Sequence, residues 1–461
     1  MHRLGQAARL PPMHLHLRFI VVPVALVAAM AAGLACSVST MGGPEAVSPE
    51  EAGAPAEAAA PVDGAVSAPL LWERRFNEAP IHAMAVTEAG DIFIIGELNG
   101  PTDFGAGVVT PAAGEVSYLA KLGSDGKLAW SKPLRGTTDM QQDWSLAADS
   151  AGGVYVAGVV SGLVNLGGAD IELGFSAPGS TSVVFAHFDK AGAHVESSPI
   201  LDCRGKCEKA LISATAKGVV VLMTSTDAVQ TPFVLGGTQT VYNGAGIFMF
   251  QRASDGSAST GTTGASGRGF GLGQDTATGR IYVATASGTT SRITERAWTG
   301  ASTDDWDYTS ADLHGFAIDD SKRTFLSGYF PGGNNGAKQL VQTLGPTVEW
   351  NKGVLVTGDA SVTLRDSTVV YDAQSETSIF AGDFTGKITI DGVDFATRSA
   401  PGKDDVDIFV VRFDHAGKMI GHQQLGDGSH EKAVGVALLP NHRVVVAGES
   451  NNKGYLTAIS L

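Results

Sequence analysis

Two cysteines separated by three residues form the most reactive pair in the sequence. Cys203 and Cys207 enclose Arg204, Gly205 and Lys206, in a chain that has 3 cysteines in all. A metal site would need further ligands, and no nearby histidine supplies them. If the chain is exported, as its N-terminus indicates below, we expect a disulfide. Its stabilising effect should be small, because it closes a short loop.

Three aspartates within four residues could offer hard oxygen ligands to calcium. Asp404, Asp405 and Asp407 precede and enter an apolar segment at 408–413. However, the Asp-x-Asp-x-Asp-Gly spacing with a distal glutamate, which marks a calcium loop, is missing here. We therefore expect polar turn residues that lead into a strand, and no metal site.

A third set of candidates consists of polar and aromatic side chains at the starts of short apolar segments. Its members are His82, Asp143, Trp144, Lys209, Phe270, His314, Asp366 and Lys432. No nucleophile elbow, histidine pair on a helix or cofactor-binding motif accompanies them, so we assign no catalytic residue and expect no cofactor. Because they are far apart in sequence, these side chains can act together only if the fold gathers the starts of the segments.

The element that must position them is a repeated β-hairpin. Residues 145–158, SLAADSAGGVYVAG, read as a strand, an Asp-Ser-Ala-Gly turn and a second strand closed by Gly158. Six relatives occur at 83–96, 210–223, 271–285, 315–328, 368–382 and 434–448. Their closing positions, from Gly96 to Gly448, are 62, 64, 62, 44, 54 and 66 residues apart. A period in this range indicates a propeller or a solenoid.

A second hairpin follows the first in most repeats. It occurs at 117–130, 184–196, 247–259 and 409–421, with an Asp-x-x-Gly or Ser-Asp-Gly turn. Two hairpins give the four antiparallel strands of one propeller blade. With 59 glycines and few runs of helix-favouring residues, we expect an all-β chain, and the repeats predict a seven-bladed β-propeller over 70–461. The second hairpin cannot be placed in 286–342. This stretch could therefore form part of two separate blades or of one distorted pair of blades.

The two ends of this region complement each other. Residues 454–461 form a third strand with no fourth after it, while 70–76, LLWERRF, resemble the strand that follows the turn of a second hairpin. We expect this N-terminal strand to complete the last blade, which would remove exposed sheet edges. The alternative is a pair of stacked β-sandwiches, which would not require matching ends.

The repeats also resemble a known family. DWSLAADSAGGVYVAGVVSG at 143–162 and DDVDIFVVRFDHAGK at 404–418 are similar to the bacterial β-propeller repeats named for a seven-bladed propeller. That resemblance covers most of 70–461. It implies an exported propeller, and it provides no catalytic residues to carry over.

The N-terminus reads as an export signal. Arg3, Arg9 and Arg18 precede an apolar run at 19–30, which is followed by small residues. The run is short for a membrane span. We expect a signal peptide over 1–35, and an uncleaved amphipathic anchor is the alternative.

The residues around the expected cleavage site resemble a lipobox. Gly33-Leu34-Ala35-Cys36 is similar to the processing site of bacterial lipoproteins, although Gly33 stands where that family prefers an aliphatic residue. The resemblance implies acylation of Cys36, and ordinary signal cleavage is the alternative. Residues 36–69 are rich in Ala, Pro and Glu, so we expect a lipidated cysteine followed by a disordered linker. Two or more acyl chains would anchor the protein stably to a membrane.

These features predict a protein of the cell envelope. With Lys+Arg 32 against Asp+Glu 47, the net charge of -15 and the lack of a basic segment argue against nucleic acid as a partner. We expect a non-catalytic lipoprotein, anchored to the outer membrane, whose propeller is a binding or scaffolding module for an envelope protein or a glycan. The alternative is a freely secreted propeller enzyme, a hydrolase, lyase or quinone-dependent dehydrogenase, with its site at the central channel mouth.

Overall fold

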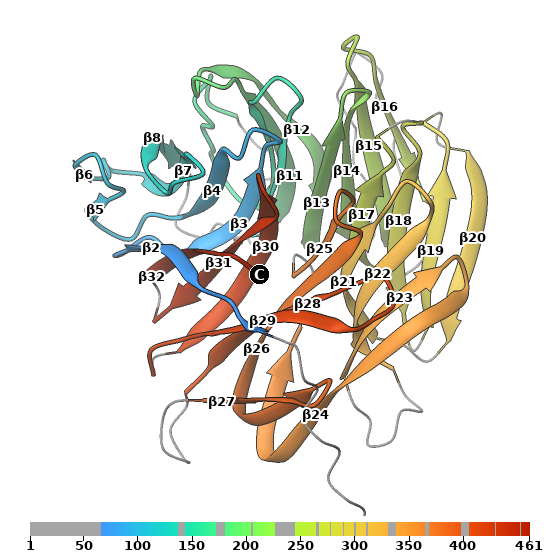
Figure 1. The fold of residues 1–461 in the computed structure, drawn as a ribbon. Coiled ribbons are helices and arrows are strands. Elements are labelled where there is room, and N and C mark those ends of the chain that lie inside the picture. Colours follow the sequence, from blue (N-terminus) through green and yellow to red (C-terminus); the bar gives the residue numbers. More distant parts are fainter. Residues whose placement is uncertain are drawn as a thin grey trace, which may run out of the picture. The chain divides into compact units, whose positions relative to one another are not determined.

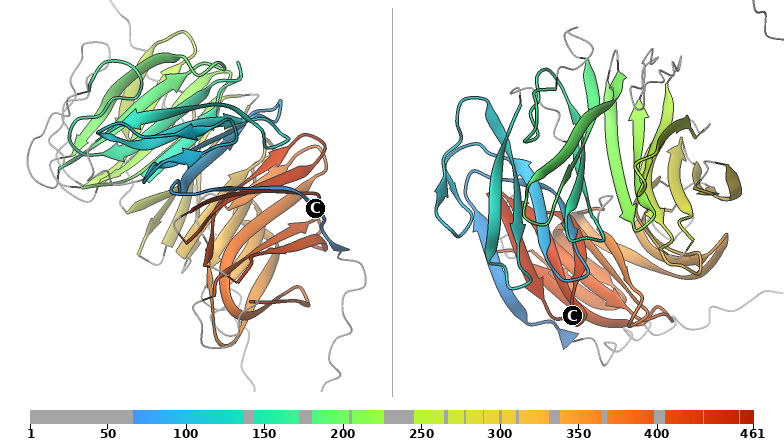
Figure 2. Two further views of the ribbon diagram at one scale, coloured as in Figure 1. Left: turned by 90° about the vertical axis from the view of Figure 1, so that its left-hand side faces the viewer. Right: turned by 90° about the horizontal axis from the view of Figure 1, so that it is seen from above.

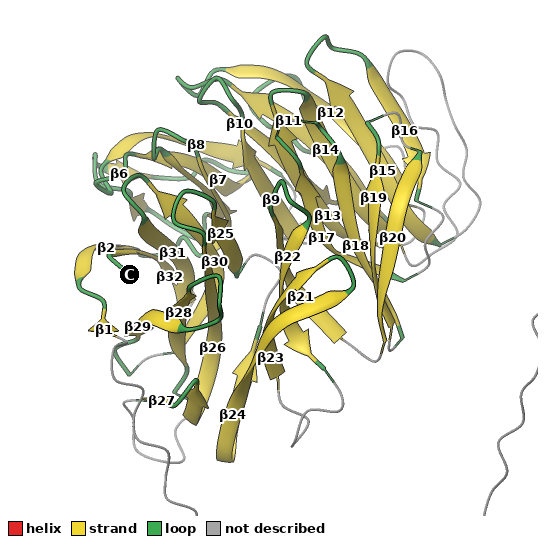
Figure 3. Ribbon diagram, turned by 45° about the vertical axis from the view of Figure 1, so that its right-hand side comes forward, coloured by secondary structure: helices red, strands yellow, loops and turns green. Residues whose placement is uncertain are grey.

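β-Strands joined by tight turns make up the part of the chain that the structure describes, and no helix occurs in that part (Figure 3). In this computed structural model the described residues are 66–136, 143–171, 180–203, 206–225, 245–263, 267–276, 278–288, 290–298, 301–309, 312–330, 338–364, 368–397, 405–428, 430–451 and 453–461. The expected signal peptide (1–35), Cys36 and most of the linker (36–69) lie outside them. Contacts divide the chain into Met1–Ala58 and Ala59–Leu461, and the description below concerns the second unit. Within the described ranges, no helix could cross a membrane.

The repeated hairpins form where the sequence predicts them. In the hairpin at 145–158, β9 (Asp143–Ala148) pairs antiparallel with β10 (Val154–Val160). The carboxylate of Asp149 accepts hydrogen bonds from the backbone N–H groups of Ala151 and Gly153, at 2.9 and 2.6 Å. Gly152 takes a φ of 86°, which costs a residue without Cβ little. The Asp-x-x-Gly sequence therefore determines this turn.

Most strands belong to antiparallel sheets of four. The first sheet contains β3 (Ile81–Val86), β4 (Ile92–Glu97), β7 (Glu115–Leu122) and β8 (Leu128–Arg135). The second contains β9, β10, β11 (Thr181–Phe188) and β12 (His194–Cys203). The third contains β13 (Cys207–Thr215), β14 (Gly218–Ser225), β15 (Gly246–Ala253) and β16 (Ala258–Thr262). The fourth contains β17 (Arg268–Gln274), β18 (Ile281–Ser287), β19 (Thr290–Arg296) and β20 (Ser302–Thr309). β5 (Thr102–Asp103) and β6 (Val108–Val109) form a small separate hairpin.

The next two groups of four strands are fused into one ten-stranded sheet. One group is β21 (Asp312–Ile318), β22 (Arg323–Tyr329), β23 (Lys338–Leu344) and β24 (Thr347–Thr363). The other is β25 (Val369–Asp372), β26 (Thr377–Ile390), β28 (Asp407–Phe413) and β29 (Met419–Leu425), with β27 (Val393–Ala396) at the side of β26. β24 and β26 are 17 and 14 residues long, and their extended ends pair with each other. The stretch 286–342, left open by the sequence, contains regularly paired strands of two consecutive groups.

Both ends of the unit contribute to the last sheet. It consists of β30 (Glu431–Leu439), β31 (Arg443–Ser450), β32 (Lys453–Ile459) and β2 (Leu70–Phe76). β2 runs antiparallel to β32 beside the C-terminus (Figure 1). The predicted completion of this sheet by the N-terminal strand is therefore confirmed. The residues just before β2 are also paired, but with another sheet. β1 (Val66–Ser67), at the end of the expected linker, runs parallel to β29 of the ten-stranded sheet.

The groups of strands follow one another in a closed series. The first strand of each group lies against the first strand of the next, in the order β3, β9, β13, β17, β21, β25, β30 and back to β3. In the right-hand view of Figure 2 the colours accordingly follow the sequence around a centre. Successive antiparallel sheets around a centre define a β-propeller-type fold.

Hydrophobic clusters fill the spaces between successive groups. Between the second and third sheets, for example, Phe185 of β11 meets Phe250 of β15 with ring centroids 5.7 Å apart. β14 is buried along its whole length. Because other sheets cover both of its faces, such a strand reads as a continuous apolar run and not as an alternating one.

A β-bulge recurs near the start of the first strands, opposite the glycine that closes the hairpin. In β3 the extra residue is His82, and in β21 it is His314. A Cβ on the closing Gly96 would lie 1.9 Å from the carbonyl oxygen of Pro80. The closing glycine is therefore needed because the backbone of the first strand passes too close for any side chain.

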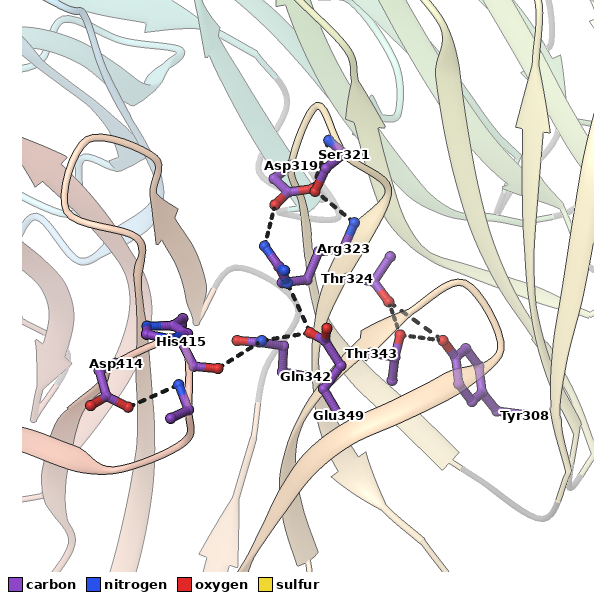
Figure 4. A network of polar contacts seen from close by, with 11 residues as sticks. Tyr308, Asp319, Ser321, Arg323, Thr324, Gln342, Thr343, Glu349, Asp414 and His415 are labelled. Carbon is purple, nitrogen blue, oxygen red and sulfur yellow. Dashed lines mark hydrogen bonds and ion pairs between the residues drawn. The ribbon is translucent and has the colours of Figure 1, made fainter.

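Buried hydroxyl groups connect the fourth sheet to the β21–β24 group (Figure 4). The hydroxyl of Tyr308, on β20, lies 2.7 Å from Oγ1 of Thr343 on β23. Thr343 in turn lies 2.5 Å from Oγ1 of Thr324 on β22. These contacts satisfy polar groups that the packing of the two sheets buries.

A second chain of contacts in Figure 4 connects the β21–β24 group to the turn after β28. The guanidinium of Arg323 contacts Asp319 at 3.3 Å and Glu349 at 2.8 Å. Gln342 donates to Glu349 at 2.7 Å and to the carbonyl of His415 at 3.2 Å. Polar contacts thus cross from one group to the next in addition to the hydrophobic clusters.

Candidate functional site

Cys203 and Cys207 form the predicted disulfide, with their Cα atoms 5.7 Å apart. Both side chains are fully buried. Cys203 ends β12, the last strand of the second sheet, and Cys207 begins β13, the first strand of the third. The bond therefore fixes the crossover between two sheets, a structural role. Arg204 and Gly205 between them lie outside the described residues.

Seven of the eight residues predicted to gather at a channel mouth lie near the starts of the first strands. His82, Asp143, Trp144, Lys209, Phe270, His314 and Lys432 each occupy one of the first three positions of their strand. Asp366 lies outside the described residues. These strands are neighbours around the centre, and a propeller brings the starts of such strands to one mouth.

Two of these residues are not available to a ligand, and the expectation for them was wrong. Trp144 is only 6% exposed and packs against Gly158, where a Cβ would lie 2.2 Å from the indole ring. Phe270 is fully buried in the cluster between the fourth sheet and the β21–β24 group, together with Tyr282. Both are large apolar side chains, and they are buried in the hydrophobic packing between sheets.

The remaining titratable side chains influence one another across the centre. Burial lowers the pKa of His314, and the positive charges of Arg268, Lys338 and Lys209 add to this effect, while Asp312 opposes it. Lys209 belongs to β13, which is separated from β21 by β17. Its influence on His314 therefore reaches past a neighbouring strand.

Arg268 and Asp312 form direct contacts around His314. Nη2 of Arg268 lies 3.5 Å from the carboxylate of Asp312 and 3.4 Å from Nδ1 of His314. Nε2 of His314 lies 3.5 Å from the same carboxylate. We call Asp143, Lys209, Arg268, Asp312, His314 and Lys338 the mouth cluster.

The pKa values of Asp143 and Lys338, two further members of the mouth cluster, are also shifted. Desolvation by the surrounding protein raises the pKa of Asp143, although this residue is exposed to solvent, and the charge of Lys209 opposes the shift. Burial lowers the pKa of Lys338, while the negative charges of Asp312 and Asp383 act in the opposite direction and raise it. Groups of opposite charge thus share a partly desolvated space, which is typical of binding sites with polar anchors.

His82 occupies a separate position around the same centre. Its Nε2 lies 3.8 Å from Oε1 of Glu97, at the end of β4. Burial lowers the pKa of His82, and the charge of Glu449 opposes this shift. Lys432, opposite Glu449 in the pairing of β30 with β31, lies in the neighbouring sheet.

Sequence reasoning missed Arg268, Asp312, Lys338 and Asp383. Arg268 and Asp312 are the first residues of β17 and β21, and the expected hairpins at 271–285 and 315–328 begin after them. The sequence did contain a signal for them, because in each case a charged residue stands three positions before the expected hairpin. Lys338 and Asp383 lie on β23 and β26, and only the fold reveals their proximity.

A groove of about 520 Å³ lies at the outer strand β12. His194, Glu196 and Asp170 are among its lining residues. His194 contacts the hydroxyl of Ser197 at 2.9 Å. Because residues 172–179, which follow this lining, lie outside the described ranges, we assign it no function.

Two of the three aspartates considered for calcium are not solvated turn residues. Asp405 and Asp407 are buried and lie close to Glu431. Asp404 lies outside the described residues. Burial raises the pKa of Glu431 to about 7, with further contributions from Asp427 and Asp407. Within the described residues this cluster could hold a metal ion.

Comparisons with known proteins give likenesses of fold only. No family profile matches the chain, and no curated protein matches its sequence. Solved structures that are similar include the Dos1 propeller (9% identity, TM-score 0.47, covering 84% of this chain and 94% of the other). They also include the WD40 domain of coronin from Toxoplasma gondii (10%, 0.43, 86% and 88%) and the NanB sialidase from Streptococcus pneumoniae (11%, 0.39, 84% and 68%). At these values the likenesses carry no argument about function.

Proposed function

We propose that this chain is an exported, lipid-anchored protein of the cell envelope whose seven-bladed β-propeller binds a protein or glycan partner at the mouth cluster. The observation that carries the proposal is the convergence of Lys209, Arg268, Asp312 and His314 from three strands at one end of the centre. Their sequence positions span more than a hundred residues, and a partner with both charged and hydroxyl groups would complement them.

The blade count rests on two observations. The described strands fall into groups of four that begin with β3, β9, β13, β17, β21, β25 and β30. Between each of these groups and the next lies a separate hydrophobic cluster. The fusion of β24 with β26 joins two blades at their extended ends and leaves these clusters distinct.

The envelope location rests on the sequence of 1–69 alone. Lipidation at Cys36 predicts that the mature protein from its native membrane begins at Cys36 and carries acyl chains. Intact mass measurement with mapping of the N-terminal peptide tests this. An unmodified terminus would leave a freely secreted protein as the better description.

Site-specific photo-crosslinking tests the mouth as the binding surface. A crosslinking amino acid replaces Lys432 at the mouth or, as a control, Lys217, which lies in the turn after β13 at the opposite end of that strand. The proposal predicts one defined adduct in intact cells from position 432 and none from position 217. Lys209→Glu in the same protein should reduce the adduct at least about tenfold, since it reverses a charge in the cluster. Equal adducts from both positions would refute a site at the mouth.

The alternative of a secreted enzyme has one observation in its favour. His314 and Asp312, 3.5 Å apart, could act together as an acid–base pair. Turnover of a glycoside or ester that disappears in His314→Ala but survives in His82→Ala would favour that alternative over a binding module.

A further inference from the structure

Three buried carboxylates meet at the boundary between the β25–β29 group and the last sheet. Asp405 lies two residues before β28, Asp407 begins that strand, and Glu431 begins β30. One oxygen from each lies within 4.8 Å of the others. Their exposed fractions are 3%, 0% and 0%. This arrangement differs from a cluster of surface acids, which water would solvate.

The backbone holds these residues in place. Val406 and His430 form a parallel bridge, and the N–H of Glu431 donates to the carbonyl of Val406 at 2.9 Å. Gly426 takes a φ of 153°, and a Cβ there would lie 1.9 Å from Oδ1 of Asp407. Since any side chain at 426 would collide with this oxygen, only glycine leaves room for the carboxylate of Asp407 here.

Glu431 provides an observation that is independent of the clustering. Its Oε1 accepts a hydrogen bond from Ser450 at 3.2 Å. Its Oε2 is buried and has no hydrogen-bond partner among the residues that the structure describes. The carboxylate of Asp427 lies within hydrogen-bonding reach of Glu431 and raises its pKa, but it adds negative charge and supplies no donor when ionised. A fully buried carboxylate oxygen in this position requires a positive charge or a proton.

A second buried glutamate shows the usual solution. Glu295 is 1% exposed, and its two oxygens lie 2.7 Å from Arg280 and 2.6 Å from Lys322. Two cations of the chain therefore compensate its charge. Glu431 has no such ion pair among the described residues.

We propose that Asp405, Asp407 and Glu431 bind a divalent cation, calcium, between β28 and β30. Calcium prefers carboxylate oxygens, and ligands on opposite sides of the ion lie about 4.6–5.2 Å apart, because each lies at 2.3–2.6 Å. The three oxygens lie within 4.8 Å of one another, which is close enough for them to share one ion. Magnesium demands a stricter octahedral geometry with ligands at about 2.0–2.1 Å and usually keeps several waters, whereas calcium accepts a less regular set of carboxylate oxygens. The chelation joins two groups of strands that the backbone connects here through the Val406–His430 bridge.

Calcium titration of the full mature chain tests the site. Isothermal calorimetry on protein stripped with EDTA should give one calcium per chain. Saturating calcium should raise the melting temperature by about 3–5 °C, since an ion that binds only the folded state stabilises it by mass action. Magnesium at the same concentration should have a clearly smaller effect. Absence of calcium binding in the calorimeter, or an equal response to magnesium, would overturn the proposal.

A pair of matched variants locates the ion. Glu431→Gln keeps the shape and removes one buried charge, so the variant should fold without calcium and bind it roughly tenfold or more weakly. Glu295→Gln alters the comparable buried glutamate of the fourth sheet and should retain the affinity of the parent. Asp407→Asn, which has the same shape as the parent residue, provides a second test if Glu431→Gln does not fold. Unchanged calcium affinity in the folded site variants would place the ion elsewhere and refute the assignment.

Discussion

At the scale of single residues, Arg412 is the most connected buried charge of the described chain. It is 5% exposed and lies on β28. Its guanidinium reaches Asp372 of β25 at 3.0 Å and donates to the carbonyl of the C-terminal Leu461 at 2.7 Å. His442, in the turn before β31, lies 2.6 Å from the same oxygen of Asp372. One side chain thus connects the β25–β29 group to the end of the chain.

Arg412→Ala should lower the free energy of unfolding by about 3–5 kcal/mol, because it leaves the buried carboxylate of Asp372 without its main counter-charge. Arg292→Ala is the control. Arg292 pairs with Asp307 at 2.6 Å, but both side chains are largely exposed, so its loss should cost at most about 1 kcal/mol. Urea unfolding of the two variants measures the difference. Equal losses would show that burial does not decide the strength of these pairs.

The same cluster predicts a pH dependence. Burial alone would raise the pKa of Asp372, but hydrogen bonds from Ser375 and His442 outweigh it and hold the pKa below its usual range. The ionised form therefore stabilises the fold at any pH above the unfolded value of about 3.9, and this contribution disappears as the pH falls through the lowered folded value. Asp372→Asn should consequently be less stable than the parent at pH 7, and the gap should close below about pH 4. A gap that persists in acid would contradict the assignment.

At the scale of elements, the closing glycine and the bulge of the first strand form one unit. The glycine allows the strand start to pass close by, and the bulge turns His82 and His314 out of the regular alternation. Two of the polar residues at the mouth therefore owe their position to a backbone irregularity. The glycine was visible in the repeats, whereas nothing in the side-chain pattern marks the extra residue.

Gly96→Ala should destabilise the protein by about 1–3 kcal/mol, since the new Cβ would lie 1.9 Å from the carbonyl oxygen of Pro80 and the first strand must shift. Gly246→Ala is the matched control, because a Cβ on this strand residue would meet no atom within 4 Å. Thermal unfolding of both variants measures the effect. If the control loses as much stability as Gly96→Ala, loss of glycine in general, and not the close approach, is responsible.

Hairpins could be predicted from the sequence because their turns are local. Asp149 with Gly152 determines one of them by contacts within five residues. Burial at the mouth could not be predicted in the same way. Trp144 and Lys209 both stand at strand starts, but only the packing of the next sheet decides that the first is buried and the second is not. Glu431 likewise meets Asp405 and Asp407 only through a pairing between two groups of strands.

At the scale of the whole unit, β2 is the strand on which closure depends. It covers the edge of β32, whose backbone would otherwise be exposed. A protein shortened to begin after residue 77 should melt at a lower temperature and form oligomers through that edge. One shortened to begin at residue 66 should behave like the parent, because it retains β2. Calorimetry and light scattering on both measure this, and a monomeric, equally stable shorter variant would show that closure is dispensable.

The β2–β32 pairing also determines when the last sheet can form during synthesis and folding. β2 leaves the ribosome long before β32, so the final sheet cannot be completed until all the strands between them have been made. The other groups consist of strands close in sequence and can form as they emerge, whereas this contact spans nearly the whole unit. Loop entropy grows only by about 0.6 kcal/mol for each doubling of length, so the long separation costs little stability. It does slow the search, because folding rates fall as contacts become less local. We expect β2 and β32 to join in the slowest step of folding.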